Sequence, residues 1–318
     1  MILMLIWFMK STAIDTHHSK SQNEHQFRNC PQLFDEKTIK LIYNAIDKGA
    51  KLYGSVSGGK DGQAMVKSLH DIAMPLTGLI HADLGKVEWK ESMPQCQKNS
   101  EACNVPLYVC RRKDGAGLLE YWQRRMLKVE GQGIPFWSSA NIRYCTSDLK
   151  RGPINVFFIA TGNDFIISCE GIRADESPKR SQKPAISIRS NSSTFYAGMT
   201  PDQAINAYRP GKKLILTWYP VFNYTLEDVW ITHGMTPLLL QAARTEYNHT
   251  GIVPAWWPFH PAYAYGNDRV SCRYCIMGSL NDLKTAAKHD DDGLLEEMIQ
   301  MEEYSGFTFK NDFSLKQL

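Results

Sequence analysis

The stretch LYGSVSGGKDGQAMVKSLHDI, residues 52–72, decides the fold. A strand-like run ends in SGGKD, and an amphipathic pattern begins directly after it. Ser57, Gly58 and Gly59 can turn successive backbone N–H groups into one concavity, because glycine adds no side chain that blocks a close approach. The following helix adds the positive end of its dipole, and Lys60 adds a point charge. The stretch therefore predicts a strand, an anion-binding turn and a helix.

The residues from Gly54 to Lys60 also satisfy the first seven positions of the Walker A pattern. Its eighth position is Ser or Thr, whose hydroxyl ligates magnesium. Asp61 occupies that position here. An ordinary phosphate-cleaving P-loop is therefore disfavoured, whereas the backbone cradle does not depend on the eighth residue.

Strand-like runs alternate with helical patterns along the first half of the chain. The expected strands lie at 51–56, 76–82, 105–110 and 164–169, and the expected helices at 61–72, 116–128 and 143–159. This alternation favours an α/β fold with a mostly parallel twisted sheet and helices on both faces. Right-handed crossovers bring the carboxyl ends of such strands to one edge, where ligands usually bind.

Further elements are expected outside this alternation. They are a helix to about Lys48 capped by Asp35, a long loop at 176–212, a strand that leads into a turn at 214–222, a helix that Thr225 and Asp228 cap, and a helical stretch at 279–304. We therefore divide the chain into a flexible segment at 1–30, a nucleotide-binding domain at 31–280 and a C-terminal helical extension at 281–318.

Composition predicts a packed soluble core. The 318 residues are 43% hydrophobic and 22% charged, and the net charge of +3 neither demands nor excludes a nucleic-acid partner. The apolar start MILMLIWFM is shorter than the roughly 20 residues of a membrane span, and it lacks the flanks of a signal peptide. We therefore expect a cytoplasmic protein without a membrane partner.

The turn SGGKD between a strand and a helix resembles the loop of the PP-loop ATP pyrophosphatases. That superfamily usually has serine after the aspartate, and Gly62 stands there in this chain. The difference removes one hydroxyl contact, so the strength of phosphate binding stays open.

Five further stretches resemble one branch of this superfamily, the phosphoadenosine phosphosulfate (PAPS) reductase family. They are HADLGKVEW (81–89), RYCTSDLKRGP (143–153), GIRADESPKR (171–180), WYPVFNYTLEDVW (218–230) and HPAYAYGNDRVSCRYC (260–275). The matches cover roughly 50–280 in the expected order, and the ordered set is far more specific than any one of them. The resemblance implies a Rossmann-like PP-loop fold that binds an adenine nucleotide.

The resemblance also implies a set of site residues. Lys60, Asp61 and Arg173 are the expected catalytic residues, and Ser57, Gly58, Gly59, Lys60, Asp61, Asp83, Lys150, Arg173, Glu176 and Arg180 are expected to hold ATP with Mg²⁺. Arg173 follows a strand, where a guanidinium can grip a phosphate or sulfate with two hydrogen bonds. Asp83 would contact ribose or magnesium, or else cap a helix, and the charges of Glu176 and Arg180 also suit a solvated face.

The cysteines suggest a metal site rather than disulfides. Eight cysteines are scattered along the chain, apart from the C-x-x-C pair of Cys272 and Cys275. With Cys145 they would form a three-cysteine site that suits a [4Fe–4S] cluster with one open iron, or Zn²⁺ with a fourth ligand. The alternatives are a reduced, partly buried pair and a buried thiol. The layout is similar to relatives in this family that install sulfur on nucleic acids, including the DNA phosphorothioation proteins.

The missing C-terminal cysteine argues against the reductase reaction. PAPS reductases use a cysteine in an ECGLH motif, and this sequence has no cysteine after Cys275. We therefore expect cleavage of the α–β bond of ATP to adenylate an acceptor, coupled to sulfur transfer, with nucleic acid and a sulfur-donor protein as candidate partners. The alternatives are reduction or hydrolysis of an adenylyl sulfate, and a nucleotide-binding regulatory protein without turnover.

Overall fold

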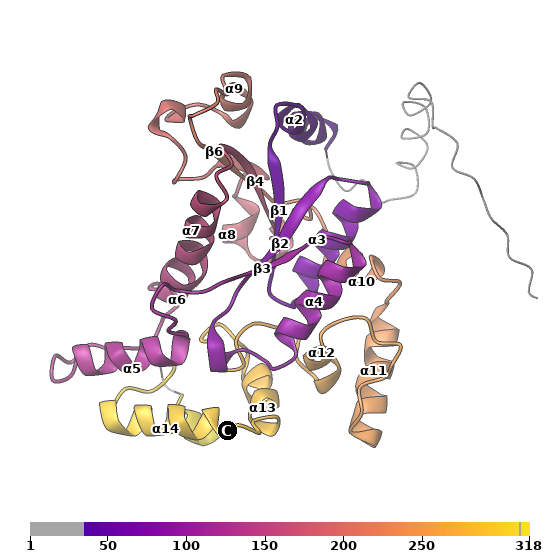
Figure 1. Ribbon diagram of the computed structural model, residues 1–318. Coiled ribbons are helices and arrows are strands. Elements are labelled where there is room, and N and C mark those ends of the chain that lie inside the picture. Colours follow the sequence, from indigo (N-terminus) through magenta and orange to yellow (C-terminus); the bar gives the residue numbers. More distant parts are fainter. Residues whose placement is uncertain (1–34, 312) are drawn as a thin grey trace, which may run out of the picture. The chain divides into compact units, whose positions relative to one another are not determined.

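A six-stranded sheet forms the centre of the fold (Figure 1). The computed structural model describes residues 35–311 and 313–318, so the segment predicted to be flexible, 1–30, lies outside the described residues. The strands are β1 (Lys51–Val56), β2 (Leu76–Ala82), β3 (Leu107–Cys110), β4 (Phe165–Glu170), β5 (Ile186–Ile188) and β6 (Leu214–Trp218). Their order is β3-β2-β1-β4-β6-β5, and every pair is parallel except β5 with β6. The predicted mostly parallel sheet is confirmed.

Helices cover both faces of this sheet, as predicted. On one face α7 (Gly152–Ala160) buries Ile154 and Phe158 against strand residues that include Tyr53 and Ile166. On the other face lie α3 (Lys60–Asp71) and α4 (Ser92–Ala102) (Figure 1). Residues buried on both faces explain why the strands read as continuous apolar runs.

The remaining helices fill the edges and the C-terminal part. They are α2 (Glu36–Asp47), α5 (Leu118–Lys128), α6 (Tyr144–Thr146), α8 (Pro178–Ser181), α9 (Pro201–Asn206), α10 (Leu226–Ile231), α11 (Pro237–Thr250), α12 (Pro261–Tyr265), α13 (Leu280–Lys288) and α14 (Leu294–Ser305). Short turns of helix add η1 (Gly85–Val87), η2 (Ser147–Arg151), η3 (Ala174–Glu176), η4 (Thr194–Tyr196) and η5 (Leu315–Gln317). The predicted caps form, since Asp35 accepts from Thr38 and the Thr225–Asp228 capping box is complete.

One sequence prediction of local structure was wrong in its extent. The loop expected at 176–212 contains α8, β5 and α9. The helix expected at 143–159 is confirmed as an unbroken helical stretch over residues 144–160, in which η2 forms a π-helical turn between α6 and α7. The strand expected within 214–222 ends at Trp218, and the turn expected after it begins at Pro220.

The C-terminal helices share a core with the middle of the chain. Leu283 of α13 and Met298 of α14 belong to the same buried cluster as Trp122 of α5 and Trp230 of α10. The predicted helical C-terminal part is confirmed, whereas the boundary at residue 280 stays a prediction. Within the described residues no helix is long and apolar enough to span a membrane.

Strand register brings several loops to one edge of the sheet. Ser55 of β1 pairs with Glu170 of β4, and Cys169 of β4 pairs with Trp218 of β6. The segments that follow β1, β4 and β6 therefore begin level with one another at the carboxyl edge, where the sequence predicts a ligand.

Candidate functional site

The turn between β1 and α3 presents unpaired backbone amides. Among the described residues, the N–H groups of Ser57, Gly58 and Gly59 donate no hydrogen bond. Gly59 is the N-cap of α3 and offers no side-chain cap to its first turn. Three successive free amides at the start of a helix attract an anion, because the helix dipole points the same way. The predicted cradle therefore has the required backbone geometry.

Gly58 needs to be glycine for two independent reasons. Its φ of +76° lies in the left-handed region, which side chains with a Cβ rarely adopt. An added Cβ would also lie 3.1 Å from the His260 ring and from the backbone of Ser92. The loop is thus held against α4 and the segment before α12.

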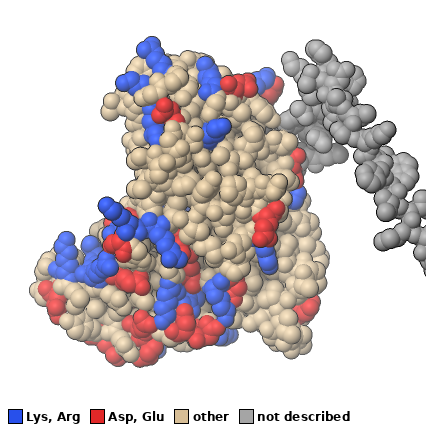
Figure 2. Space-filling model, viewed as in Figure 1, with Lys and Arg blue, Asp and Glu red and all other residues tan. Residues whose placement is uncertain are grey.

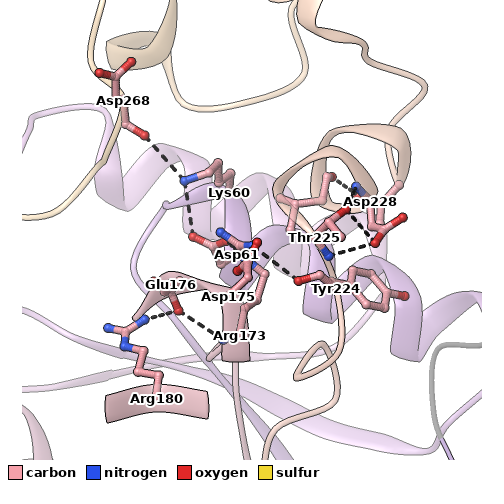
Figure 3. A network of polar contacts seen from close by, with 12 residues as sticks. Lys60, Asp61, Arg173, Asp175, Glu176, Arg180, Tyr224, Thr225, Asp228 and Asp268 are labelled. Carbon is pink, nitrogen blue, oxygen red and sulfur yellow. Dashed lines mark hydrogen bonds and ion pairs between the residues drawn. The ribbon is translucent and has the colours of Figure 1, made fainter. Parts of the chain in front are cut away.

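Lys60 places its ammonium beside two aromatic rings, a carboxylate and a carbonyl, and Figure 3 shows the contacts with the last two. The residue is 6% exposed, and its Nζ lies 5.9 Å from the Trp230 ring centroid and 5.4 Å from that of Tyr263. The same Nζ lies 3.4 Å from the carboxylate of Asp61 and 3.5 Å from the carbonyl of Asp268. Because π faces attract a cation, the two rings hold the ammonium in place beside the loop.

Tyr263 also bonds directly to the turn, since the Lys60 N–H donates to its hydroxyl over 2.9 Å. Trp230 is 4% exposed and belongs to the buried core. Its ring nevertheless faces the lysine, so it acts as core and as part of the site. Sequence analysis named the motifs that contain these aromatic residues but did not assign them to Lys60.

Asp61 joins the start of α3 to the loop after β4. Its Oδ1 accepts a hydrogen bond from Arg173 Nε over 2.7 Å, and Arg173 also pairs with Asp175 and donates to the Tyr224 carbonyl over 3.3 Å (Figure 3). Burial alone would lower the pKa of Arg173, but the charges and hydrogen bonds of the two aspartates outweigh it and raise that pKa. The predicted catalytic residues Asp61 and Arg173 are therefore in contact.

Glu176 and Arg180 shape the same loop. The Glu176 carboxylate accepts a hydrogen bond from the Arg173 N–H over 3.0 Å and forms an ion pair with Arg180 (Figure 3). This arrangement closes η3 as a capping box. In this structure both charges fix the loop, while their predicted contact with nucleotide remains a prediction.

Asp83 has the capping role that was one of its two expected roles. Its Oδ1 accepts from the Gly85 N–H over 2.7 Å at the start of η1, and its Oδ2 accepts from Arg111 Nε over 2.8 Å. Asp83 also lines a cavity of about 580 Å³ together with Trp89, Tyr265 and the segment 288–292. This cavity is separate from the turn, since none of the residues 57–60 lines it.

Two buried histidines, His81 and His260, contact residues next to the turn. His81 Nδ1 lies 3.1 Å from the Val56 carbonyl, which can only accept, and Nε2 lies 3.0 Å from Glu88. Burial alone would lower the pKa of His81. The hydrogen bonds to Cys96 and Glu88 have a larger effect in the opposite direction and raise the pKa to about 10. The imidazolium thus ties the last residue of β1 to the loop after β2.

His260 is a structural histidine rather than an acid–base group. It is fully buried, accepts a hydrogen bond from the Ala262 N–H over 3.1 Å, and lies 3.3 Å from the Ser92 hydroxyl. Burial lowers its pKa to about 3, so the ring stays neutral at physiological pH. It caps α12 and packs against Gly58 in the turn of residues 57–60, which we call the phosphate turn.

The three predicted metal ligands are neighbours but do not form a metal site. Burial raises the pKa of the Cys272 thiol, and the charges of Cys275 and Cys145 act in the same direction, while Lys150 acts against them. Yet no three His, Cys, Asp or Glu side chains of the described residues converge as metal ligands. A [4Fe–4S] cluster or Zn²⁺ therefore does not fit the donors as they stand.

The residues between Cys272 and Cys275 hold the C-x-x-C segment in place. Its two inner residues, Arg273 and Tyr274, are buried at 5% and 1% exposure. Arg273 donates from its backbone to the Val87 carbonyl over 2.9 Å and from its side chain to Asp292. These bonds fix the segment through the residues between the cysteines.

Comparison with known proteins gives a family match over the nucleotide-binding part. A model of the phosphoadenosine phosphosulfate reductase domain matches residues 51–238. An uncharacterized protein of Methanocaldococcus jannaschii is 23% identical over 256 residues, which cover 79% of this chain and 42% of that protein. The chain therefore spans less than half the length of this curated relative.

Two solved structures show distant likeness. A phosphoadenylyl-sulfate reductase from Candida auris is 16% identical with a TM-score of 0.43, covering 83% of this chain and 98% of that one. An FMN adenylyltransferase from Candida glabrata is 12% identical with a TM-score of 0.37, covering 73% of this chain and 62% of that one. The domain match, which includes the phosphate turn and the loop of Arg173, shows that the chain belongs to the phosphoadenosine phosphosulfate reductase domain family.

Proposed function

We propose that this chain is a PP-loop enzyme that binds ATP and cleaves its α–β bond to adenylate an acceptor. The observation that carries the proposal is the run of unpaired amides at Ser57, Gly58 and Gly59 beside the buried ammonium of Lys60. Oriented amides and a charge in a dry pocket stabilise a leaving anion without reorganisation. Pyrophosphate is the anion that such a turn suits.

The adenylation step assigns a role to each charged residue. An acceptor oxygen forms a bond to the α-phosphorus, and the bond from that phosphorus to the bridging oxygen breaks, so the electron pair leaves with pyrophosphate. Lys60 and the turn amides bind the pyrophosphate, and Arg173 steadies Asp61 at the start of α3. Mg²⁺ usually binds through phosphate oxygens and one or two carboxylates, and Asp61 supplies a carboxylate at this position.

Sulfur transfer is the second half of the proposal. A sulfur nucleophile bonds to the acceptor atom that carries the adenylated oxygen, and AMP leaves with that oxygen. The thiols of Cys145, Cys272 and Cys275 are the candidate relay for sulfur from a donor protein, because they lie together near Lys150. No step is assigned to a metal cluster, since these thiols do not form a ligand set in this structure.

The family match favours a second candidate, reduction of an adenylyl sulfate. In that reaction a thiol of a dithiol reductant bonds to the sulfate sulfur, and the bond from that sulfur to the phosphate oxygen of the nucleotide breaks. The second thiol then forms a disulfide with the first, and sulfite leaves with the electron pair. DNA, RNA and a small molecule are the candidate acceptors for the first proposal.

Nucleotide turnover by the anaerobically purified protein separates these functions. The protein would be incubated with α-labelled ATP and, in turn, DNA, RNA and small-molecule acceptors. Acceptor-dependent release of AMP and pyrophosphate is the expected result. Sulfite release from PAPS with thioredoxin would establish the reductase instead, and ATP binding without any product would indicate a regulatory protein.

Lys60→Met and Lys67→Met form a matched pair for this assay. Both lysines lie in α3, but Lys67 is only half-buried and pairs with Asp71 four residues along the helix. The first substitution should weaken ATP binding by about tenfold or more, which is the expected loss of one charge-assisted contact. The second should leave ATP binding unchanged. Equal ATP affinity in both variants would contradict the proposal.

A further inference from the structure

Positive side chains gather around Tyr219, directly after β6. Lys183 places its Nζ 5.6 Å from the Tyr219 ring centroid, and Arg151, Arg180 and Arg189 all act electrostatically on the same tyrosine. Tyr219 is 8% exposed, and its hydroxyl has no hydrogen-bond partner within the described part of the chain. This tyrosine cluster therefore combines four cations with an unused hydroxyl.

Among the residues that the structure describes, two carboxylates pair with these four cations. Glu170 accepts from Arg189 over 3.1 Å, and Glu176 pairs with Arg180. For Arg151 and Lys183 the described residues offer no acidic partner. The pKa of Arg189 is lowered, first by burial and also by Arg151, despite the opposing charge of Glu170. The cluster therefore carries uncompensated positive charge.

Arg189 cannot be the residue that turns toward a ligand. It is 7% exposed, and its guanidinium also donates to Ser168 over 3.2 Å and to Asn155 over 3.1 Å. Arg151 and Lys183 are exposed, so their charged groups can move to meet an anion. Figure 2 shows other Lys and Arg side chains gathered on the visible face over the region of α5 and α6.

The tyrosine cluster lies at the same edge of the sheet as the phosphate turn. The register that pairs Ser55 with Glu170 and Cys169 with Trp218 sets the ends of β1, β4 and β6 level. Two strand spacings separate β1 from β6, which corresponds to about 10 Å. One tetrahedral anion cannot reach both places, so the cluster suits a second anionic group.

We propose that Arg151, Lys183 and Tyr219 form a second anion site, which takes a phosphate group carried by the acceptor. This inference rests on the proposed adenylation of an acceptor at the phosphate turn. Arginine, lysine and a phenolic hydroxyl all donate hydrogen bonds that match phosphate oxygens. The acceptor class is thus a phosphate ester whose reacting atom lies between the two sites.

The alternative source of the phosphate is the nucleotide itself. Inorganic phosphate serves as the probe, and its ³¹P line width would be titrated with protein alone and with protein saturated with a non-hydrolysable ATP analogue. The expected result is that phosphate binds in both cases. Phosphate binding that the analogue abolishes would show that the cluster serves ATP, and no phosphate binding at all would likewise overturn the inference.

Variants locate the bound phosphate. Lys183→Met and Arg151→Met should each weaken phosphate binding by about tenfold while the affinity for the ATP analogue changes less than about twofold. Lys212→Met is the control, because Lys212 is exposed and precedes β6 at the opposite edge of the sheet. Unchanged phosphate affinity in the first two variants would overturn the inference. If phosphate binds but the ATP analogue does not, the proposed function fails while the anion site stands.

Discussion

Replacing Gly171 with alanine tests whether the loop after β4 must press directly on the start of α3. A Cβ added at Gly171 would lie 2.6 Å from the Asp61 carbonyl oxygen and 2.7 Å from both the Asp61 carbonyl carbon and the Gly62 nitrogen. All three atoms belong to the backbone, so no side-chain rotation relieves the clash. Overpacking of this kind typically costs about 1–3 kcal/mol, and we expect Gly171→Ala to fall in the upper half of that range.

Gly62 supplies the matched control in the same contact. A Cβ there would meet the Ser55 carbonyl and the Val56 Cα at 3.7 Å, which is an ordinary van der Waals distance. Gly62 lies in the first turn of α3, where alanine is favoured over glycine by roughly 0.5–1 kcal/mol. The same substitution should therefore stabilise the protein at residue 62 and destabilise it at residue 171.

Urea unfolding of both variants measures these free energies, and ATP titration reports the shape of the turn. Gly171→Ala should also weaken ATP binding, because the clash displaces Asp61 and the turn before it. Gly62→Ala should retain ATP binding. The packing argument is wrong if Gly171→Ala unfolds at the wild-type urea concentration, or if Gly62→Ala lowers that concentration.

Three other substitutions test the surroundings of the turn. Lys60→Met should leave the free energy of unfolding nearly unchanged, which thermal melting would check. An apolar side chain of similar length fits between the aromatic rings, and a buried ion pair contributes little net stability. Because the pKa of His81 is raised to about 10, its stabilising effect is complete below about pH 6.5 and is lost as the pH rises toward 10. Glu88→Gln should flatten this fall in stability, which urea unfolding at several pH values would show. Tyr224→Phe removes the 2.9 Å hydrogen bond to Ser68 and should cost about 1 kcal/mol in urea unfolding, and no loss would mean that the bond is not formed.

The sequence predicts the phosphate turn well because its determinants are local. A strand, two glycines, a lysine and an aspartate stand within about ten residues, and each acts on the backbone of its neighbours. The alternation of strands and helices likewise predicts a parallel sheet, and so predicts that the ligand binds at its carboxyl edge. By contrast, β5 is only three residues long and lies in a polar stretch, so no periodic pattern marks it.

The surroundings of Lys60 depend on contacts that no local pattern specifies. Tyr263 bonds to the Lys60 N–H from 203 residues away, and the Trp230 ring approaches the same ammonium. Each motif is visible in the sequence, but their meeting depends on how α10 and α12 pack against α3. The cysteine spacing has the same weakness, because it gives the number of thiols and not the direction of their sulfur atoms.

The charge balance around the turn argues that backbone amides contribute most to anion selection there. Lys60 and Arg173 supply two positive charges, and Asp61 and Asp175 supply two negative charges in contact with them. Side chains alone therefore attract a phosphate only weakly. The N–H groups of Ser57, Gly58 and Gly59 have no acceptor within the described residues, so they remain available to an anion. The tyrosine cluster is the reverse case, because its excess charge lies on side chains, and this contrast supports two anion sites with different chemistry.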